Sequence, residues 1–122
     1  MVSEHKESKK QRRNDMTEMD LLRLVRLKMS EIGVCCFRVN VGKVKTEDGR
    51  WFDTGLPKGF SDLLCIKDGK AYFIELKVGD NKPSAEQLNF IKQMQTRYGC
   101  RAGIARSVED ALKIVGEEVT ND

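Results

Sequence analysis

The dipeptide Asp68-Gly69 constrains the fold of this chain more than any other feature. Both central residues of a two-residue hairpin turn need a positive φ, and Asp-Gly favours such a turn. Apolar runs lie on either side of it, at residues 63–66 and 71–76. The sequence therefore predicts a β-hairpin in which Lys67 faces Lys70 and Leu64 faces Phe73.

The register of this hairpin brings two carboxylates together. Directly opposed residues lie on the same face of a sheet with Cβ atoms roughly 4.5–5.5 Å apart, so Asp62 faces Glu75. Lys77 lies two residues beyond Glu75 and points to that face as well. Two opposed carboxylates in an apolar hairpin repel each other unless a positive charge lies between them. Mg²⁺ takes one or two carboxylates plus water and phosphate oxygens, so we interpret the hairpin as a metal-dependent phosphodiester-cleaving site.

Both faces of the hairpin are apolar. The carboxylate face carries Leu64, Ile66, Ala71 and Phe73, and the other face carries Leu63, Cys65, Tyr72, Ile74 and Leu76. Strands that are apolar on both faces need cover on both sides, so we expect helices above and below the sheet.

The first expected helix begins near Asp15 or Thr17 and ends at Gly33. Leu21, Leu24 and Leu27 widen its apolar stripe, which predicts a substantially buried helix. With Asp15 as N-cap, Glu18 occupies position N3 and interacts favourably with the helix N-terminus. Alternatively, Glu18 is a third carboxylate directed at the metal.

Two further helices are expected in the second half of the chain. Ser84-x-x-Gln87 is a capping box that opens a helix continuing to Gly99, so position N3 fully explains Gln87 on structural grounds. A short strand at residues 101–106 follows. Ser107 then opens a last helix that ends at Gly116.

Residues 34–41 are β-rich, with Cys35, Phe37, Val39 and Val41 on one face. Arg38 and Asn40 share the other face, either as a solvated strand surface or as contacts to a DNA backbone. A second hairpin is expected from residues 43–46 and 50–54. Its adjacent Trp51 and Phe52 point to opposite faces, so one of them is expected to pack inward and the other to be available for a base or a partner.

The elements follow the order α-β-β-β-β-α-β-α. This order predicts an α/β protein, a three-layer α/β/α sandwich with a mixed central sheet. The 122 residues are enough for one domain with a modest core. Its four cysteines lack zinc-ligand spacing, so we expect reduced, mostly core-filling thiols rather than structural zinc.

Positive charge is concentrated in two stretches of a chain whose net charge is +3. We expect residues 1–14 to form a basic flexible arm that is either solvated or in contact with DNA. Residues 15–116 form the expected folded domain, and 117–122 a flexible tail. No apolar run reaches the roughly 18–20 residues of a membrane span and no secretory signal is evident, so we expect an intracellular, cytoplasmic location (the host cytoplasm if viral) with no membrane contact.

An ordered set of motifs resembles the PD-(D/E)xK nuclease superfamily, and more closely a stand-alone VRR-NUC (virus-type replication-repair nuclease) domain. The matching segments are Thr17-Glu18, Arg38-Val39-Asn40-Val41-Gly42, Lys58-Gly59-Phe60-Ser61-Asp62, Phe73-Ile74-Glu75-Leu76-Lys77, Ser84-x-x-Gln87-x-x-Phe90 and Ser107-Val108-Glu109-Asp110-Ala111. They cover about residues 17–115. Two features depart from the wider family: Ser61 stands where a proline is familiar, and the DNA-binding domains of its large repair members are lacking.

The resemblance implies a restriction-endonuclease-like αβββαβ core and specific roles for five residues. Asp62 and Glu75 would ligate Mg²⁺ or Mn²⁺ together with the backbone carbonyl of Leu76, and Glu18 would bind the metal directly or through water. Lys77 would orient or deprotonate the attacking water, and Gln87 would help to position Lys77 or phosphate. Residues expected to contact DNA are Arg38, Asn40, Lys43, Lys45, Lys58 and Ser61.

These expectations favour a metal-dependent DNA endonuclease (a deoxyribonuclease) that needs no organic cofactor. A small domain offers little surface for reading base edges, so we expect selectivity for branched structures such as four-way (Holliday) junctions, with a role in DNA repair. A homodimer would place two sites on two strands. The alternatives are a non-catalytic DNA-binding or assembly module of the same fold and a sequence-specific restriction-type nuclease.

Overall fold

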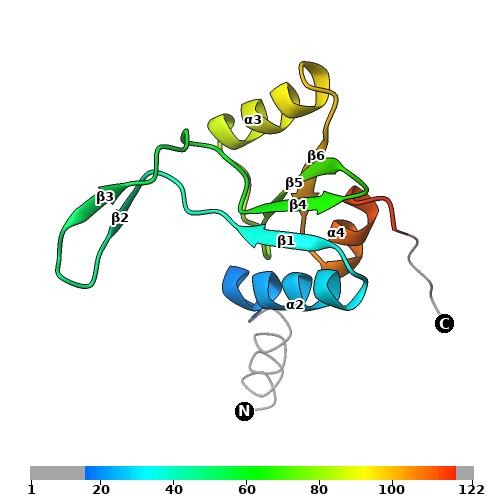
Figure 1. Cartoon of the computed structure of the whole chain (residues 1–122), viewed down its shortest axis with the longest axis horizontal. Coiled ribbons are helices and arrows are strands. Elements are labelled where there is room, and N and C mark those ends of the chain that lie inside the picture. Colours follow the sequence, from blue (N-terminus) through cyan, green and yellow to red (C-terminus); the bar gives the residue numbers. More distant parts are fainter. Residues whose placement is uncertain (1–15, 118–122) are drawn as a thin grey trace, which may run out of the picture.

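A mixed four-stranded sheet forms the centre of the protein, whose structure, a computed structural model, describes residues 16–117 (Figure 1). The strands lie in the order β1-β4-β5-β6, antiparallel except for the parallel pair β5–β6. The elements are α2 (Glu18–Glu31), β1 (Cys35–Arg38), β2 (Lys43–Lys45), β3 (Trp51–Asp53), β4 (Leu63–Lys67), β5 (Lys70–Leu76), α3 (Ala85–Thr96), β6 (Arg101–Ala105) and α4 (Val108–Ile114). The expected α/β class and mixed sheet are confirmed. Five strands precede α3, one more than the expected order counts, and two of them, β2 and β3, form a separate two-stranded ribbon.

The central hairpin has the register expected from Asp68-Gly69. Leu64 pairs with Phe73 and Lys67 with Lys70. Asp68 and Gly69 both have positive φ, 52° and 75°. The last pair of the hairpin is Leu63 with Ile74, and Asp62 and Glu75 are the next residues along the two chains.

Helices cover both faces of the sheet, as its apolar composition requires. Helices α2 and α4 pack on one face, over a core that includes Leu63, Cys65, Ile74 and Leu76 (Figure 1). On the other face, α3 contributes Ile91 to a smaller core around Phe73. Phe60, Phe73 and Phe90 pack against one another there, with ring centroids 4.6–5.7 Å apart. The carboxylate end of the hairpin is therefore held between two packed layers.

The N-terminus of α2 differs from the expectation. Thr17, not Asp15, is the N-cap, and it forms a capping box with Asp20 at N3. Glu18 therefore lies at N1, still in the first turn, where a negative charge interacts favourably with the helix dipole. The helix is also less buried than expected, because Leu24 and Leu27 face outward and Leu27 is 59% exposed.

Strand β1 is shorter than expected, and its partly buried face is the one that carries Cys36. Cys36 packs against the α2 side of the core, whereas Cys35 and Phe37 are exposed. The reason is position: β1 is an edge strand, and α3 packs on β5 and β6 at the other side of the sheet. The apolar alternation of residues 34–41 identifies a strand but not which of its faces is covered.

The C-terminal end of the described chain is anchored. The Glu117 carboxylate lies 2.6 Å from the Lys67 ammonium, and the Glu117 N–H donates to the Leu112 carbonyl. The expected flexible tail is therefore wrong for Glu117. Residues 118–122 and the basic arm at residues 1–14 lie outside the described residues. Within residues 16–117, no helix is long and apolar enough to cross a membrane.

Candidate active site

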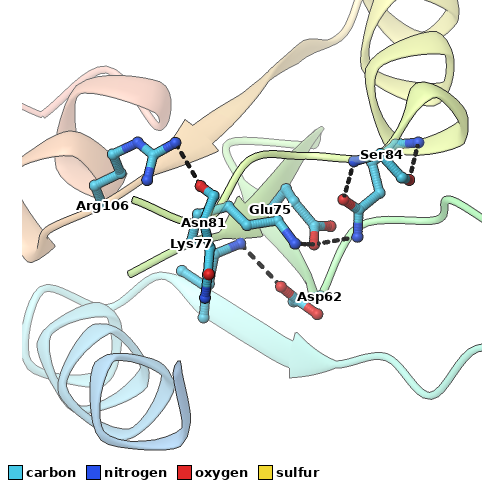
Figure 2. A network of polar contacts seen from close by, with 8 residues as sticks. Asp62, Glu75, Lys77, Asn81, Ser84 and Arg106 are labelled. Atoms are coloured by element: carbon cyan, nitrogen blue, oxygen red, sulfur yellow. Dashed lines mark hydrogen bonds and ion pairs between the residues drawn. The ribbon is translucent and has the colours of Figure 1, made fainter. Parts of the chain in front are cut away.

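Asp62 lies at the entrance to β4 and is tied to the end of β5. Its Oδ2 accepts a hydrogen bond of 2.9 Å from the backbone N–H of Leu76 (Figure 2). On the other side, its carbonyl accepts from the N–H of Val39, just beyond β1. Three neighbouring strands therefore fix the position of this carboxylate.

The loop before Asp62 is held tightly against the start of α3. Gly59 has φ +96°, and a Cβ at this position would lie 2.5 Å from the Glu86 carbonyl oxygen. Only glycine permits this close approach of two backbones. The contact brings Lys58, at the mouth of the loop, next to Glu86, with 3.6 Å between Nζ and Oε1.

Glu75 is a buried carboxylate with one satisfied oxygen and one unsatisfied oxygen. The side chain is 2% exposed, and the Gln87 amide donates to Oε1 at 2.8 Å (Figure 2). The Lys77 ammonium lies 3.9 Å from the same Oε1. Oε2 has no hydrogen-bond partner among the described residues. A buried carboxylate oxygen without a partner is costly, so Oε2 needs either a proton, which a hydrogen bond to Asp62 would use, or a cation.

Burial and the neighbouring Asp62 carboxylate raise the pKa of Glu75 to about 8, and the Lys77 charge only partly opposes this rise. Without another positive charge, the pair Asp62–Glu75 cannot hold two negative charges at neutral pH. Mg²⁺ or Mn²⁺ would supply that charge and give Oε2 a partner. The donor set therefore fits a hard divalent cation.

We expect the metal-free protein to lose stability as the pH rises through the titration of Glu75. Because the folded pKa is about 8 and the ordinary value is 4.5, the folded state holds the proton more tightly. The resulting stabilisation is complete below pH ~4.5 and is lost as the pH rises through ~8. Urea unfolding in EDTA should show the free energy of unfolding falling by about 2–4 kcal/mol between pH 5.5 and 9.

Glu75→Gln is the control for this measurement, because the amide keeps the shape of the side chain and does not titrate. The variant should show a much flatter profile over the same pH range. An equal fall in both proteins would assign the pH dependence to other groups.

Hydrogen bonds fix the backbone at Lys77 and in the loop that follows it. Its N–H donates to the Ala105 carbonyl in β6, and its side chain is 13% exposed. Arg106 holds the loop that follows, donating to the Gly79 carbonyl at 3.0 Å and to the Asn81 carbonyl at 2.8 Å; Figure 2 shows the bond to Asn81. Sequence reasoning missed Arg106, because bonds to carbonyls of a distant loop leave no local pattern.

Gln87 has both a structural and a site role. Its Oε1 accepts from the Ser84 N–H in the expected capping box, while its Nε2 donates to Glu75. The structure therefore directs Gln87 to Glu75, a partner that the sequence did not indicate. The Gln87 side chain thus caps the N-terminus of α3 and also orients the Glu75 carboxylate.

Glu18 lies at the same end of the sheet but in a different layer from Glu75. A cleft of about 120 Å³ is lined by Glu18, Arg38 and Asp62, together with Leu76. Helix α2 covers the face opposite Glu75, so Asp62 lies between the two glutamates. Within residues 16–117, no three His, Cys, Asp or Glu side chains are close enough to hold a metal together. A direct bond from Glu18 to a metal shared with Glu75 is therefore not preformed. A contact from Glu18 to the metal through water stays a prediction.

The residues expected to contact DNA divide into exposed and buried positions. Arg38, Asn40, Lys43, Lys45 and Lys58 are exposed, and Arg38 lines the cleft. Ser61 is fully buried, and its hydroxyl has no partner among the described residues. A DNA contact by the Ser61 side chain is therefore wrong, because this side chain has no exposed surface.

The comparisons with known proteins give no match. No protein-family model, no curated protein and no solved structure matches this chain. Only the residues of the site therefore indicate what chemistry it supports.

Proposed function

We propose that this protein is a metal-dependent DNA endonuclease that hydrolyses phosphodiester bonds, with a restriction-endonuclease-like core of the VRR-NUC type. One observation carries the proposal: Glu75 is buried beside Asp62 with an oxygen that lacks a partner, and Lys77 is adjacent. A purely structural role for this arrangement would require Glu75 to stay protonated beside Asp62 at neutral pH.

Asp62 and Glu75 are the residues that would hold Mg²⁺ or Mn²⁺, with the Leu76 carbonyl as a further ligand and Glu18 acting through water. The cation, when bound, lowers the pKa of water and polarises the phosphate. Gln87 orients Glu75 by occupying Oε1, and the Leu76 N–H fixes Asp62. Both carboxylates are thus prepared before the substrate arrives.

Lys77 supports the charge that develops on the phosphate and orients the attacking water. An unperturbed lysine has a pKa near 10.4, so it serves as a general base only where its surroundings lower that value. The Lys77 ammonium lies 3.9 Å from Glu75 Oε1, beside the position proposed for the cation. We therefore assign Lys77 an electrostatic role.

Branched DNA in the cytoplasm is the proposed substrate, and a symmetric homodimer is the proposed active form. Arg38 lines the cleft, and Lys43 and Lys45 lie on the nearby ribbon, which gives cations for phosphate contacts. Two copies related by a two-fold axis would present two sites to two strands.

Labelled four-way junctions, flaps, duplex and single strands, each with Mg²⁺, Mn²⁺ or EDTA, test this proposal. We expect cleavage of a branched substrate with either metal and none in EDTA. Binding without cleavage under all conditions would instead indicate a non-catalytic module. Discrete bands from plasmid DNA would indicate a sequence-specific enzyme.

A further inference from the structure

The β2–β3 ribbon extends from the body of the protein with both of its faces uncovered (Figure 1). Every residue of the two strands is exposed, including Trp51 at 68% and Phe52 at 58%. The expectation that one of these rings packs inward is therefore wrong. An isolated two-stranded ribbon is marginally stable in water, and two exposed aromatic rings on such a ribbon point to an interaction surface.

The two faces of the ribbon differ in chemistry. Val44 pairs with Phe52, and Lys45 pairs with Trp51. Residues opposite each other share a face, so one face presents Val44 and Phe52. The other face, here called the indole face, presents Trp51 opposite Lys45 and, next to them, Lys43 opposite Asp53.

The strand pairing places the indole close to the lysine that faces it. The N–H of Thr46 donates to the Arg50 carbonyl, and the N–H of Thr54 donates to the Gly42 carbonyl. Hydrogen-bonded and non-hydrogen-bonded pairs alternate along an antiparallel ladder, so Lys45 and Trp51 form a non-hydrogen-bonded pair, the closer of the two kinds. A cation and a flat aromatic surface are thus presented side by side.

Two acidic side chains of the ribbon, Asp53 and Asp48, contact its own turns, and the exposed Glu47 lies in the turn away from Trp51. Asp53 accepts from the Gly55 N–H at 2.8 Å. Asp48 accepts from the Thr46 hydroxyl and lies 3.4 Å from Arg50. Lys43 and Lys45 have no ion-pair partner within residues 16–117. The indole face therefore offers cations to an anionic partner.

The ribbon is inserted at the mouth of the candidate active site. Its chain leaves β1 after Arg38 and returns to β4 after Asp62, and both of these residues line the cleft. A strand of DNA with a phosphate in the cleft would therefore pass the base of the ribbon.

We propose that the indole face binds unpaired nucleotides next to the cleavage site, with Trp51 stacked on a base and Lys43 and Lys45 on the flanking phosphates. This inference rests on the proposed nuclease function and names the substrate class as DNA with unpaired bases beside a duplex, such as a flap or an open junction. Stacking requires the face of a base to be accessible, which a continuous duplex does not offer, and it is sequence-tolerant.

The fluorescence of Trp51 tests this directly, because it is the only tryptophan in the chain. The full-length protein in EDTA is titrated with a single-stranded oligonucleotide, a flap and a blunt duplex of matched sequence. We expect the single strand and the flap to quench the emission and the duplex to quench it far less. Equal quenching by all three, or none, would contradict the proposal.

Variants at two adjacent residues, one on each face of the β2–β3 ribbon, show which face binds DNA. Trp51→Ala should raise the Kd for a labelled flap about 5- to 100-fold, the loss expected for one base stack, as measured by anisotropy in EDTA. Phe52→Ala, on the opposite face, should bind nearly as the wild type does. Equal effects of both variants, or a Trp51 emission that changes with protein concentration alone, would overturn the proposal and assign the ribbon to a second copy of the chain.

The outcomes distinguish this inference from the proposed function. Selective quenching without cleavage in Mg²⁺ or Mn²⁺ would support the indole face and reject the nuclease. Metal-dependent cleavage with normal flap binding by Trp51→Ala would support the nuclease and reject the indole face.

Discussion

Asp62→Asn or Glu75→Gln should lower the rate of DNA cleavage by about 10³-fold or more while DNA binding persists. Each substitution keeps the shape of the side chain and removes one of two negative charges that would hold the cation. Glu75→Gln also gives its buried position a neutral group, so the metal-free variant should fold at least as well as the wild type at pH 8. The expected loss is therefore one of chemistry and not of folding.

Single-turnover cleavage of a labelled branched substrate measures the rate, and anisotropy in EDTA measures binding. Glu31→Gln is a matched control, because this exposed carboxylate at the far end of α2 pairs only with Lys28 among the described residues. The control should cleave at the wild-type rate. Full-rate cleavage by either site variant would contradict the assignment of Asp62 and Glu75.

The hairpin could be predicted from the sequence because its information is local. Asp68-Gly69 fixes the turn, the turn fixes the register, and the register places Asp62 against Glu75. The capping residues Ser84 and Ser107 were likewise predictable, because each acts within one helical turn. The N-cap of α2 is harder to predict, because Asp15 with Glu18 and Thr17 with Asp20 are both possible capping pairs. The structure uses Thr17 with Asp20.

Features that depend on which surface is covered could not be predicted. The alternation in β1 does not reveal that α3 leaves the Phe37 face open. The β2–β3 pattern likewise does not reveal that the ribbon leaves the body with both aromatic rings exposed. The close approach of Gly59 to Glu86, and the hydrogen bonds from Arg106 to the carbonyls of residues 79 and 81, each join segments 25 or more residues apart. Each is a tertiary contact with no periodic trace in the sequence.

Lys77→Met should lower the cleavage rate by about 10²-fold, with Lys77→Arg retaining a substantial part of the wild-type rate. The side chain is largely buried next to Glu75, so its charge acts in a medium that screens it weakly. Methionine keeps most of the packing of the stem and removes the charge. Arginine keeps the charge but not the compact ammonium, which explains a partial rather than full rescue.

The pH profile separates an electrostatic lysine from a general base. If Lys77 only supports charge, the cleavage rates of wild type and Lys77→Met should run parallel between pH 6 and 9, because the same groups titrate in both. If Lys77 removes the proton, the wild-type profile should contain an ionisation that Lys77→Met lacks, and Lys77→Arg should be as poor as Lys77→Met because arginine does not deprotonate in this range. Because we assign Lys77, 3.9 Å from Glu75, an electrostatic role, we expect parallel profiles.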